Sequence, residues 1–565
     1  MRRLLLRLIG VTAAFVAAVL VWVVVTLPPA ARRLADVPSS PLLVTGAYHI
    51  HSSRSDGSGT LDEIAAAAAA AGLQFVIVTD HSDGTAPPET AYRHGVLCID
   101  AAEVSTVGGH VVALGLRAAS AFPLGGETAD VVEDIHRLGG VAIAAHPNSP
   151  RPALSWRAGG NVPLDGVEWF NADSEWRAHS PGTLVAAAMR AWFRPAESVA
   201  ALFRAPAPLR RWQTPQRSGP PFTLAAVDAH ARVGGDVDEE SSSTPWSLSL
   251  PSYETMFRTV VQTVLMPAPL TGDPARDAAA VIAAIAGGHS YSVVRAFVDA
   301  PQALEFWATD GSTRVEAGGS VTDASLVALH AAVPADAAAR LVLLNNGREV
   351  ASGRNVVDFQ AAAPGWYRVE AYIDEQPMPW IVSNAIRVGG EGPLGPPVPP
   401  AQDSRAIVQV TPIAASTWVI ETDRTSVATI GREDESIRLR YQLGPGVPAG
   451  QYAALASGAS GEAAIERIEF TASSPRPLRL SVQVRLPGAA AQRWRRSIYV
   501  DDVPRRFSIR LADLDPVDRR SPLRPISARV QSILLVMDTV NARPGSSGEV
   551  LLRDLGYVVA RGDAR

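Results

Sequence analysis

Hydrophobic residues follow three different patterns along the chain, and each pattern predicts a different kind of structure. The first pattern is one uninterrupted run, because residues 8–27 contain no charged side chain. From about residue 41 to 300, short apolar runs alternate with stretches of helical character. After about residue 300, apolar residues recur at every second position, as in strands with one buried face. The chain therefore divides into an apolar N-terminus, a mixed region and a region of strands.

The apolar N-terminal run predicts a membrane anchor. A helix of twenty residues spans roughly 30 Å, the thickness of a bilayer's hydrocarbon core, whereas a signal peptide usually has an apolar core of about 7–15 residues. Three arginines precede the run and two follow it, which favours a cytoplasmic N-terminus. We expect a single-pass cell-membrane protein with residues 1–27 as its transmembrane anchor, 28–40 as a linker, and the remainder extracytoplasmic. Cleavage of the N-terminal segment would instead give a secreted form.

The mixed region combines strand signals with helix signals. Thr60 and Glu63 form a capping-box pattern before an alanine-rich helix, and a second helix is expected over residues 130–138. Strand–helix alternation of this kind predicts parallel strands, in a barrel or an open sheet. Buried strands are indicated at residues 43–48, 75–79, 96–101, 141–145, 166–170 and 223–227.

The C-terminal region has the signals of all-β structure. Asn346-Gly347 is a hairpin turn signal directly after an apolar run. Between residues 478 and 486 every second residue is apolar, which predicts a strand with one buried face and one face in water. We expect an immunoglobulin-like β-sandwich over residues 301–390, a Gly/Pro linker over 391–400, and a second β-sandwich over 401–565.

Composition narrows the class of protein. At roughly 150 residues per domain, the 565 residues correspond to three or four units. Hydrophobic residues make up 47% and charged residues 19%, which is ordinary globular composition. A net charge of −5 is mild and has the wrong sign for a nucleic-acid binder. The single cysteine, Cys98, excludes an intramolecular disulfide and a cysteine zinc cluster.

The sequence contains no lysine, so all 51 basic residues are arginine. This excludes a Walker A phosphate loop, a pyridoxal Schiff base and any lysine base or nucleophile. It also excludes a carboxylated lysine as a bridge between two metals. An anionic substrate would therefore meet arginine as the only permanently cationic side chain.

Imidazoles and carboxylates gather where the predicted strands end. His49 and His51 follow the first strand with one residue between them, so both side chains point the same way. In α/β barrels the strand ends form the active-site face. Imidazole and carboxylate ligands without sulfur suit Zn, Mn or Fe in hydrolytic sites. The remaining members of this set are Asp56, His81, Glu103, His110, His146, Asp228 and His230.

In this order and spacing the set resembles the PHP (polymerase and histidinol phosphatase) superfamily of metal-dependent hydrolases. All nine positions of the superfamily's trinuclear site are filled, with Asp56 where some members have histidine. Four short segments, residues 251–254, 288–291, 365–368 and 380–384, are similar to the CehA/McbA-type metallohydrolases. The motifs that carry the resemblance are His49-x-His51, Ser55-Asp56-Gly57, Thr79-Asp80-His81, Glu103, Gly109-His110, Ala145-His146-Pro147 and Asp228-x-His230.

The resemblance implies an α/β fold, a distorted (β/α)7 barrel over residues 41–300 with a helical insertion at 172–222, followed by the two all-β sandwiches. It also implies two or three divalent metal ions, zinc, manganese or iron, with Glu103 as a bridge. One metal would be held by His49, His51, Glu103 and Asp228, a second by Glu103, His110 and His146, and a third by Asp56, His81 and His230.

Three other residues are candidates for catalysis. Asp80 lies beside His81 but points off the ligand face of its strand, so it is expected to support the ligands from behind. Arg54 lies in the loop between His51 and Asp56, and Arg232 lies two residues after His230. Either arginine is placed to clamp a phosphate.

These expectations lead to one main function and two alternatives. The main prediction is a membrane-anchored hydrolase that uses its metal cluster to activate water, with a small-molecule or cell-envelope phosphoester as substrate. The first alternative is a carbamate, amide or ester hydrolase of the CehA type. The second is an extracytoplasmic glycan-binding protein on the same scaffold, since the last segment is similar to carbohydrate-binding jelly rolls. A role in DNA synthesis is disfavoured because the chain has no polymerase region.

Overall fold

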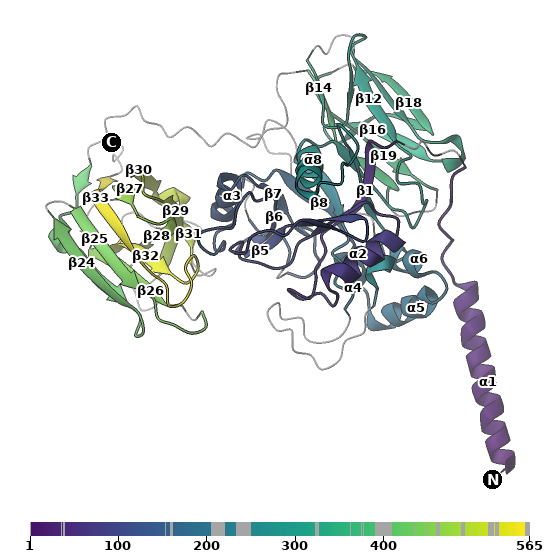
Figure 1. The fold of residues 1–565 in the computed structure, drawn as a ribbon, viewed down its shortest axis with the longest axis horizontal. Coiled ribbons are helices and arrows are strands. Elements are labelled where there is room, and N and C mark those ends of the chain that lie inside the picture. The colour runs from purple at the N-terminus through teal and green to yellow at the C-terminus, as the bar shows by residue number, and fades with distance from the viewer. Residues whose placement is uncertain are drawn as a thin grey trace.

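The computed structural model describes residues 2–559 with gaps. Its elements form one protruding helix, a body of three sheets with helices, and a C-terminal pair of sheets (Figure 1). The predicted linker at residues 391–400 lies outside the described residues. The gaps are residues 36, 38–39, 153, 159–161, 205–220, 233–249, 323–326, 362, 375, 377, 390–409, 434–435, 449, 459–463, 487–491, 518–524 and 526–529.

Helix α1 (Arg2–Val25) stands away from the body (Figure 1). Its segment Leu4–Val25 has a mean hydropathy of 2.8, and 6% of its most apolar stretch is buried. Within the described parts of the chain it is the one helix long and apolar enough to cross a membrane. The chain therefore has a single N-terminal apolar helix of the kind that serves as a membrane anchor or a signal sequence.

The largest sheet of the body combines strands from both sides of residue 300. Its order is β14-β21-β19-β20-β11-β10-β1-β2-β4-β3, and β16 and β17 extend it from β19. The strands before residue 300 are β1 (Leu43–Tyr48), β2 (Phe75–Val78), β3 (Ala91–Arg93), β4 (Val96–Asp100), β10 (Val261–Leu265) and β11 (Ser290–Val293). Those after it are β14 (Ser320–Val321), β16 (Arg340–Asn345), β17 (Arg348–Arg354), β19 (Gly365–Tyr372), β20 (Ile381–Ser383) and β21 (Ile386–Val388).

Two smaller sheets complete the body. The five-stranded sheet follows chain order: β5 (Ala102–Thr106), β6 (Gly109–Leu114), β7 (Val141–Ala144), β8 (Gly166–Asn171) and β9 (Phe222–Ala226). The four-stranded sheet has the order β13 (Arg314–Glu316), β12 (Glu305–Thr309), β15 (Ala328–Ala332) and β18 (Val356–Gln360). The predicted strands before residue 230 are thus confirmed as β1, β2, β4, β7, β8 and β9.

Helices lie between several of these strands. Helix α2 begins at the predicted capping box, since the Thr60 hydroxyl accepts from the Glu63 backbone N–H and the Glu63 carboxylate accepts from the Thr60 N–H. The predicted helix over residues 130–138 is confirmed as α3. The helices of the body are α2 (Leu61–Ala70), α3 (Thr128–Arg137), α4 (Ala172–Arg177), α5 (Pro181–Ala191), α6 (Pro195–Ala200), α7 (Tyr253–Phe257) and α8 (Pro274–Ala286).

The predicted (β/α)7 barrel is wrong. Strands predominate, and they divide between separate sheets in which antiparallel pairs alternate with parallel ones. The physical reason lies in two tight connections. His94-Gly95 joins β3 to β4, and Val107-Gly108 joins β5 to β6. A two-residue loop makes an antiparallel hairpin and leaves no room for a crossover helix.

Strands from residues 301–388 join the largest sheet, whereas a separate sandwich was expected there. Strand β20 pairs with β11 in register Ser292 opposite Val382, so the largest sheet runs without interruption across the expected boundary near residue 300. One hydrophobic core extends from Ala47 to Val388. The predicted Asn346-Gly347 turn is confirmed between β16 and β17, with φ of 49° and 74°.

The C-terminal region is a sandwich of two six-stranded sheets around its own core. The first sheet contains β24 (Val427–Glu433), β25 (Ser436–Gln442), β33 (Ser547–Val559), β27 (Ile465–Ser473), β30 (Arg505–Arg510) and β22 (Thr411–Pro412). The second contains β23 (Val419–Thr422), β26 (Tyr452–Gly458), β32 (Ser532–Asp538), β28 (Leu478–Arg485), β29 (Arg493–Val500) and β31 (Asp515–Pro516).

Strands β28 and β29 of this sandwich pack against helix α3 of the body (Figure 1). The Arg479 guanidinium is 2% exposed and donates from Nε to Asp134 at 2.7 Å and from Nη2 to the Asp130 carbonyl at 2.8 Å. Ser497 donates through its backbone N–H to Asp130 at 3.1 Å. The expectation that β28 keeps one face in water is therefore wrong, because Arg479, Ser481 and Gln483 on its polar face are all buried, Arg479 against α3.

Candidate metal centre

The two sheets that carry the predicted ligands meet at one junction. Isolated parallel bridges join Ile50 to Ala229 and His81 to Glu103, beyond the ends of β1, β2 and β9. His49 and His51 lie just after β1, and Glu103 lies within β5. All nine predicted metal ligands converge at this junction through the contacts described below.

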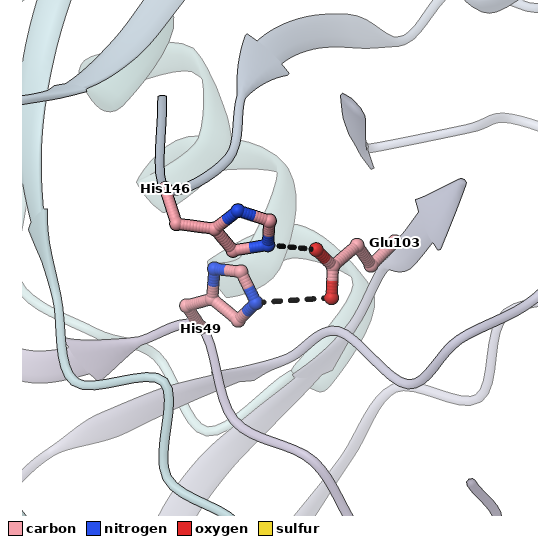
Figure 2. A group of neighbouring side chains, drawn as sticks. All are labelled: His49, Glu103 and His146. Atoms are coloured by element: carbon pink, nitrogen blue, oxygen red, sulfur yellow. Dashed lines mark hydrogen bonds and ion pairs between the residues drawn. The ribbon is translucent and has the colours of Figure 1, made fainter. Parts of the chain in front are cut away.

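Glu103 occupies the centre of the cluster. It is 1% exposed, and its Oε1 lies 2.8 Å from His110 Nδ1 and 2.8 Å from His146 Nε2. Its Oε2 lies 3.1 Å from His49 Nε2 and 3.2 Å from His51 Nε2. Figure 2 shows His49 and His146 pointing toward the two different oxygens of this carboxylate. Glu103 is thus positioned to bridge two ions.

The other two carboxylates lie on either side of His51. Asp56 Oδ1 is 3.2 Å from His51 Nδ1, and Asp56 Oδ2 is 3.1 Å from His230 Nε2. Asp228 Oδ1 is 3.4 Å from His51 Nε2. His81 lies 3.6 Å from Glu103 Oε2 through Nδ1 and 3.9 Å from Asp56 Oδ2 through Nε2. His51 therefore contacts Asp56 through Nδ1 and both Glu103 and Asp228 through Nε2.

The donor set fits divalent cations. Four groups of three side chains each offer ligand atoms within 4.8 Å of one another. The Nε2 atoms of His49 and His51 face each other at 3.1 Å. Within the described chain, the buried His81 Nδ1 and Asp228 Oδ1 meet no hydrogen-bond partner. The four groups are His49, Glu103 and His146; His49, His51 and Asp228; His51, His81 and Glu103; and His51, Asp56 and His230.

Burial and the charges of neighbouring side chains shift the pKa values of these groups in opposite directions. Burial lowers the pKa values of His49 and His146, but the neighbouring carboxylates outweigh it, raising the pKa of His49 well above its ordinary value and that of His146 to about 9. Burial raises the pKa of Glu103, but His49, His81 and His110 outweigh it and hold this pKa well below its usual range. The carboxylate is therefore ionised at neutral pH and requires protons or cations beside it.

The backbone is strained at several ligands. His49, His146 and Asp228 have φ values of 69°, 28° and 51°, in a region that residues with a Cβ rarely adopt. Such conformations cost of order 1–3 kcal/mol each and collect at functional sites. The sharp change of direction after each strand turns these side chains toward the junction.

Glu168 supports the ligands from behind and was missed among the predicted site residues. It lies within β8 and is 1% exposed. Its Oε1 accepts from His49 Nδ1 at 2.6 Å, and its Oε2 accepts from the His146 backbone N–H at 2.6 Å and from Asn171 at 3.0 Å. Because Glu168 accepts the Nδ1 proton, Nε2 is the ring nitrogen of His49 that faces the cluster and would be available to a metal ion. The available signal was a single carboxylate inside an otherwise apolar strand.

Asn171 and Tyr253 also hold the site. Asn171 donates to Asp228 Oδ2 at 3.0 Å. The Tyr253 hydroxyl donates to the His51 carbonyl at 2.8 Å, and burial raises the pKa of this phenol, so it remains a donor. Asn171 directly follows the strand predicted over residues 166–170, and Tyr253 lies in a segment similar to the CehA/McbA-type hydrolases, but neither of these hydrogen bonds has a local signal in the sequence.

The three predicted catalytic residues have different positions. Asp80 accepts from the Ser52 N–H at 2.6 Å and from the Ser55 hydroxyl at 2.7 Å, so it fixes the loop that carries Asp56. Arg54 donates to Asp80 at 2.8 Å and pairs with Asp100. The carbonyl of Arg232 accepts from Arg177 at 3.1 Å. Arg54 therefore reinforces Asp80, and a phosphate would compete with two carboxylates for its guanidinium.

A cavity of about 210 Å³ lies beside the cluster. Ser149, at its edge, donates its backbone N–H to the His146 carbonyl at 2.9 Å, and the Leu154 carbonyl lies 3.1 Å from His146 Nδ1. The cavity contains two arginines, and its lining residues are Ser149, Pro150, Arg151, Leu154, Asp173, Ser174, Arg177 and Ala178. The wall of the cavity is thus continuous with a ligand of the cluster.

No family model matches the chain. An uncharacterised protein of Methanocaldococcus jannaschii is 35% identical over 105 residues, which are 18% of this chain and 60% of that protein. The chain therefore spans less than two thirds of that relative. A family 11 carbohydrate-binding module of a Clostridium thermocellum cellulase has a TM-score of 0.22 at 12% identity, over 28% of this chain and 100% of the module. Carbohydrate-binding modules of the β-sandwich superfamily give 0.18 at 12% identity, over 46% and 98%.

Proposed function

We propose that the chain is a metal-dependent hydrolase and that the junction between the two sheets is its active site. The observation that carries this proposal is the convergence of six imidazoles and three carboxylates, one of which, Glu103, has imidazoles at both oxygens. Two or three divalent ions are the cofactors that such a ligand set suits. The resemblance of these nine positions to the metal site of PHP hydrolases agrees with this proposal.

The roles of the chain's own residues follow from their contacts. Divalent ions at such a site supply a hydroxide at neutral pH and positive charge for the transition state. Glu103 would bridge two ions, and His110 and His146 would hold the ion on its Oε1 side. Glu168 keeps His49 in the tautomer that offers Nε2. Asp80 holds the Asp56 loop through Ser52 and Ser55.

A phosphoester is the substrate class we favour. Arg151 and Arg177 line the cavity that adjoins His146, and Arg177 lies 2.6 Å from Asp173, which fixes its guanidinium in place. Arginine forks match the geometry of phosphate oxygens. A carbamate, amide or ester lacks this negative charge, and its hydrolysis is the alternative reaction for the same site.

We propose that α1 anchors the protein in a membrane, with the body outside the cytoplasm. Three arginines precede the apolar segment of α1, which favours retention of that end in the cytoplasm and export of the body. The active site would then act on small-molecule or cell-envelope esters outside the cytoplasm.

Metal content and activity test the proposal together. The full chain is purified after growth with Mn, Fe or Zn, and metal per chain is measured beside hydrolysis of phosphomonoester, phosphodiester, carboxylester and carbamate substrates. We expect bound metal and phosphoesterase activity, both greatly reduced in Glu103→Gln. Both should be retained in the control Asp165→Asn, because Asp165 directly precedes β8 and its carboxylate accepts from His136, which is not part of the cluster. Metal-free wild-type protein would refute the mechanism, and activity on the carbamate alone would support the alternative reaction.

Glycan binding by the C-terminal sandwich is a second candidate function. Arg438 and Arg440 lie on its first sheet and donate to Glu549 at 2.9 Å and 3.0 Å. Fixed polar groups on a sheet face are suited to sugar hydroxyls. Affinity electrophoresis of the full chain in gels containing soluble polysaccharides tests this candidate. Retardation that is lost in Arg440→Ala supports it, and unchanged migration in every polysaccharide excludes it for those sugars.

A further inference from the structure

The exposed face of helix α5 consists entirely of apolar residues. Within α5 and the two residues that follow it, the exposed positions are Pro181, Gly182, Val185, Ala188, Met189, Trp192 and Phe193. Trp192 is 88% exposed and Val185 is 60% exposed. A helix between a protein core and water normally presents charged or polar side chains on its outer face. The outer face of α5 is therefore suited to an apolar environment.

The opposite face of α5 already has its packing partners. Ala187 is buried in the core of the body and Leu184 packs against the same core. Val185, Met189 and Trp192 follow one another at helical spacing on the outer side. A contiguous apolar patch with a tryptophan this exposed marks an interaction surface.

The position of α5 indicates what covers this surface. Arg190 Nε donates to the Thr26 hydroxyl at 3.1 Å, and its guanidinium lies 5.1 Å from the Trp22 ring. Glu197 accepts from the Ala31 backbone N–H at 3.1 Å. Figure 1 shows α5 beside the end of α1 at which that helix joins the body. The apolar face of α5 thus lies at the level where the apolar segment of α1 ends.

We propose that the outer face of α5, with Trp192 and Phe193, rests in the lipid interface of the bilayer that α1 enters. The last turns of a membrane-crossing helix lie at the boundary between hydrocarbon and headgroups, where tryptophan is favoured. Apolar side chains bury about 5–10 Å into this layer. The Arg194 guanidinium donates to the Pro28 carbonyl, which places a cationic group beside the same boundary, where anionic headgroups attract it.

This surface would fix the orientation of the body on the membrane. A single helix tethers a domain but leaves it free to rotate, whereas a second contact beside the tether restricts rotation. The inference does not depend on the hydrolase proposal, because it uses no residue of the metal cluster.

Fluorescence quenching by lipids tests the proposal on the full chain in lipid nanodiscs. Met189→Cys and Val185→Cys, each in a Cys98→Ala background, are labelled with a nitrobenzoxadiazole dye. Val427→Cys is the matched control, since Val427 is 63% exposed on β24 of the sandwich. Brominated acyl chains should quench the dye at residues 185 and 189 at least about fivefold more than at residue 427, as expected for burial in the interface.

Two results would overturn the proposal. Equal quenching at residues 189 and 427 would show that α5 does not meet lipid. A dye at residue 189 that is shielded equally in nanodiscs and in lipid-free detergent, without lipid-dependent quenching, would show that a protein neighbour or a second copy covers the face. Two label positions are used so that failure of one variant to fold leaves the other to decide.

Discussion

Replacement of Glu168 by glutamine tests whether the buried carboxylate behind His49 sets the metal affinity of the cluster. Glu168 accepts hydrogen bonds on both oxygens, from His49 Nδ1 on one and from the His146 N–H and Asn171 on the other. A glutamine has one acceptor oxygen and one donor nitrogen. Whichever way the amide is placed, its NH₂ faces a group that must itself donate.

The expected loss follows from this mismatch. If the amide nitrogen faces His49, the imidazole must move its proton to Nε2 and can no longer offer that lone pair to a cation. If it faces the His146 N–H, a buried donor is left unpaired, at about 1–3 kcal/mol. Loss of such a supporting carboxylate typically lowers metal affinity about 10- to 100-fold, equivalent to about 1.4–2.7 kcal/mol.

Isothermal titration of metal-stripped protein with Mn²⁺ or Zn²⁺ measures this loss directly. Asp165→Asn is the matched control, because Asp165 precedes the same strand and accepts from the Ala142 N–H at 2.8 Å, away from the cluster. We expect weaker binding in Glu168→Gln and wild-type binding in Asp165→Asn. Wild-type affinity and stoichiometry in Glu168→Gln would refute the tautomer argument.

Three further perturbations follow from the same structure. Arg479→Met should destabilise the chain by about 3–5 kcal/mol in calorimetry, because it removes the buried guanidinium that pairs with Asp130 and Asp134 of α3, whereas Arg438→Met, on a surface pair, should cost at most about 1 kcal/mol; equal effects would contradict the docking role. Hydrogen bonds from Tyr92 and Thr271 hold the pKa of Asp277 at about 2, below its ordinary 3.8, so wild-type stability should fall as pH drops from about 4 to 2. Urea midpoints of Asp277→Asn should lack this slope, and an identical slope would exclude Asp277 as its source. Chelation should lower the unfolding temperature and added Mn²⁺ or Zn²⁺ should restore it, while a melt unaffected by chelator would contradict metal binding.

The strand ends and the imidazoles and carboxylates that gather there could be predicted from the sequence because both depend on local order. Apolar runs give the strands, and alternation places His49 and His51 on one face. Their convergence with Glu103 and His146 agrees with that expectation, with distances of 2.8–3.1 Å from Glu103 to His146 and His49. The capping box at Thr60 and the turn at Asn346 are local signals of the same kind.

The arrangement of the strands into sheets could not be predicted in the same way. An apolar run of four to six residues does not specify whether its neighbour is parallel or antiparallel. The hairpin turns at His94-Gly95 and Val107-Gly108 reverse the chain within two residues, where a barrel would require a helix. Pairing across long separations, such as β11 with β20, depends on tertiary contacts that have no local signature.

Burial of polar faces was equally hidden. Arg479, Ser481 and Gln483 alternate with apolar residues in β28, as they would on a strand facing water. All three are buried, and Arg479 is held there by Asp134 and the Asp130 carbonyl of α3. Glu168 has the same character, since its partners, His49 and the His146 N–H, are 119 and 22 residues away. For Arg479 and Glu168, the sequence shows the polar residue but not the distant partner that binds it in the buried site.

The cluster also has a consequence for how the body holds together. The two sheets that carry the ligands meet at the isolated bridges Ile50–Ala229 and His81–Glu103, where main-chain pairing is minimal. The ionised carboxylates Glu103 and Asp228 come from the five-stranded sheet and face His49 and His51 of the largest sheet, imidazoles that would lose protons as pH rises. A divalent ion held by His49 from one sheet and Glu103 from the other would join the two sheets at this junction. The free energy of metal binding would then contribute to the folding stability of the body, so the same ions would serve both the chemistry and the junction that hosts it.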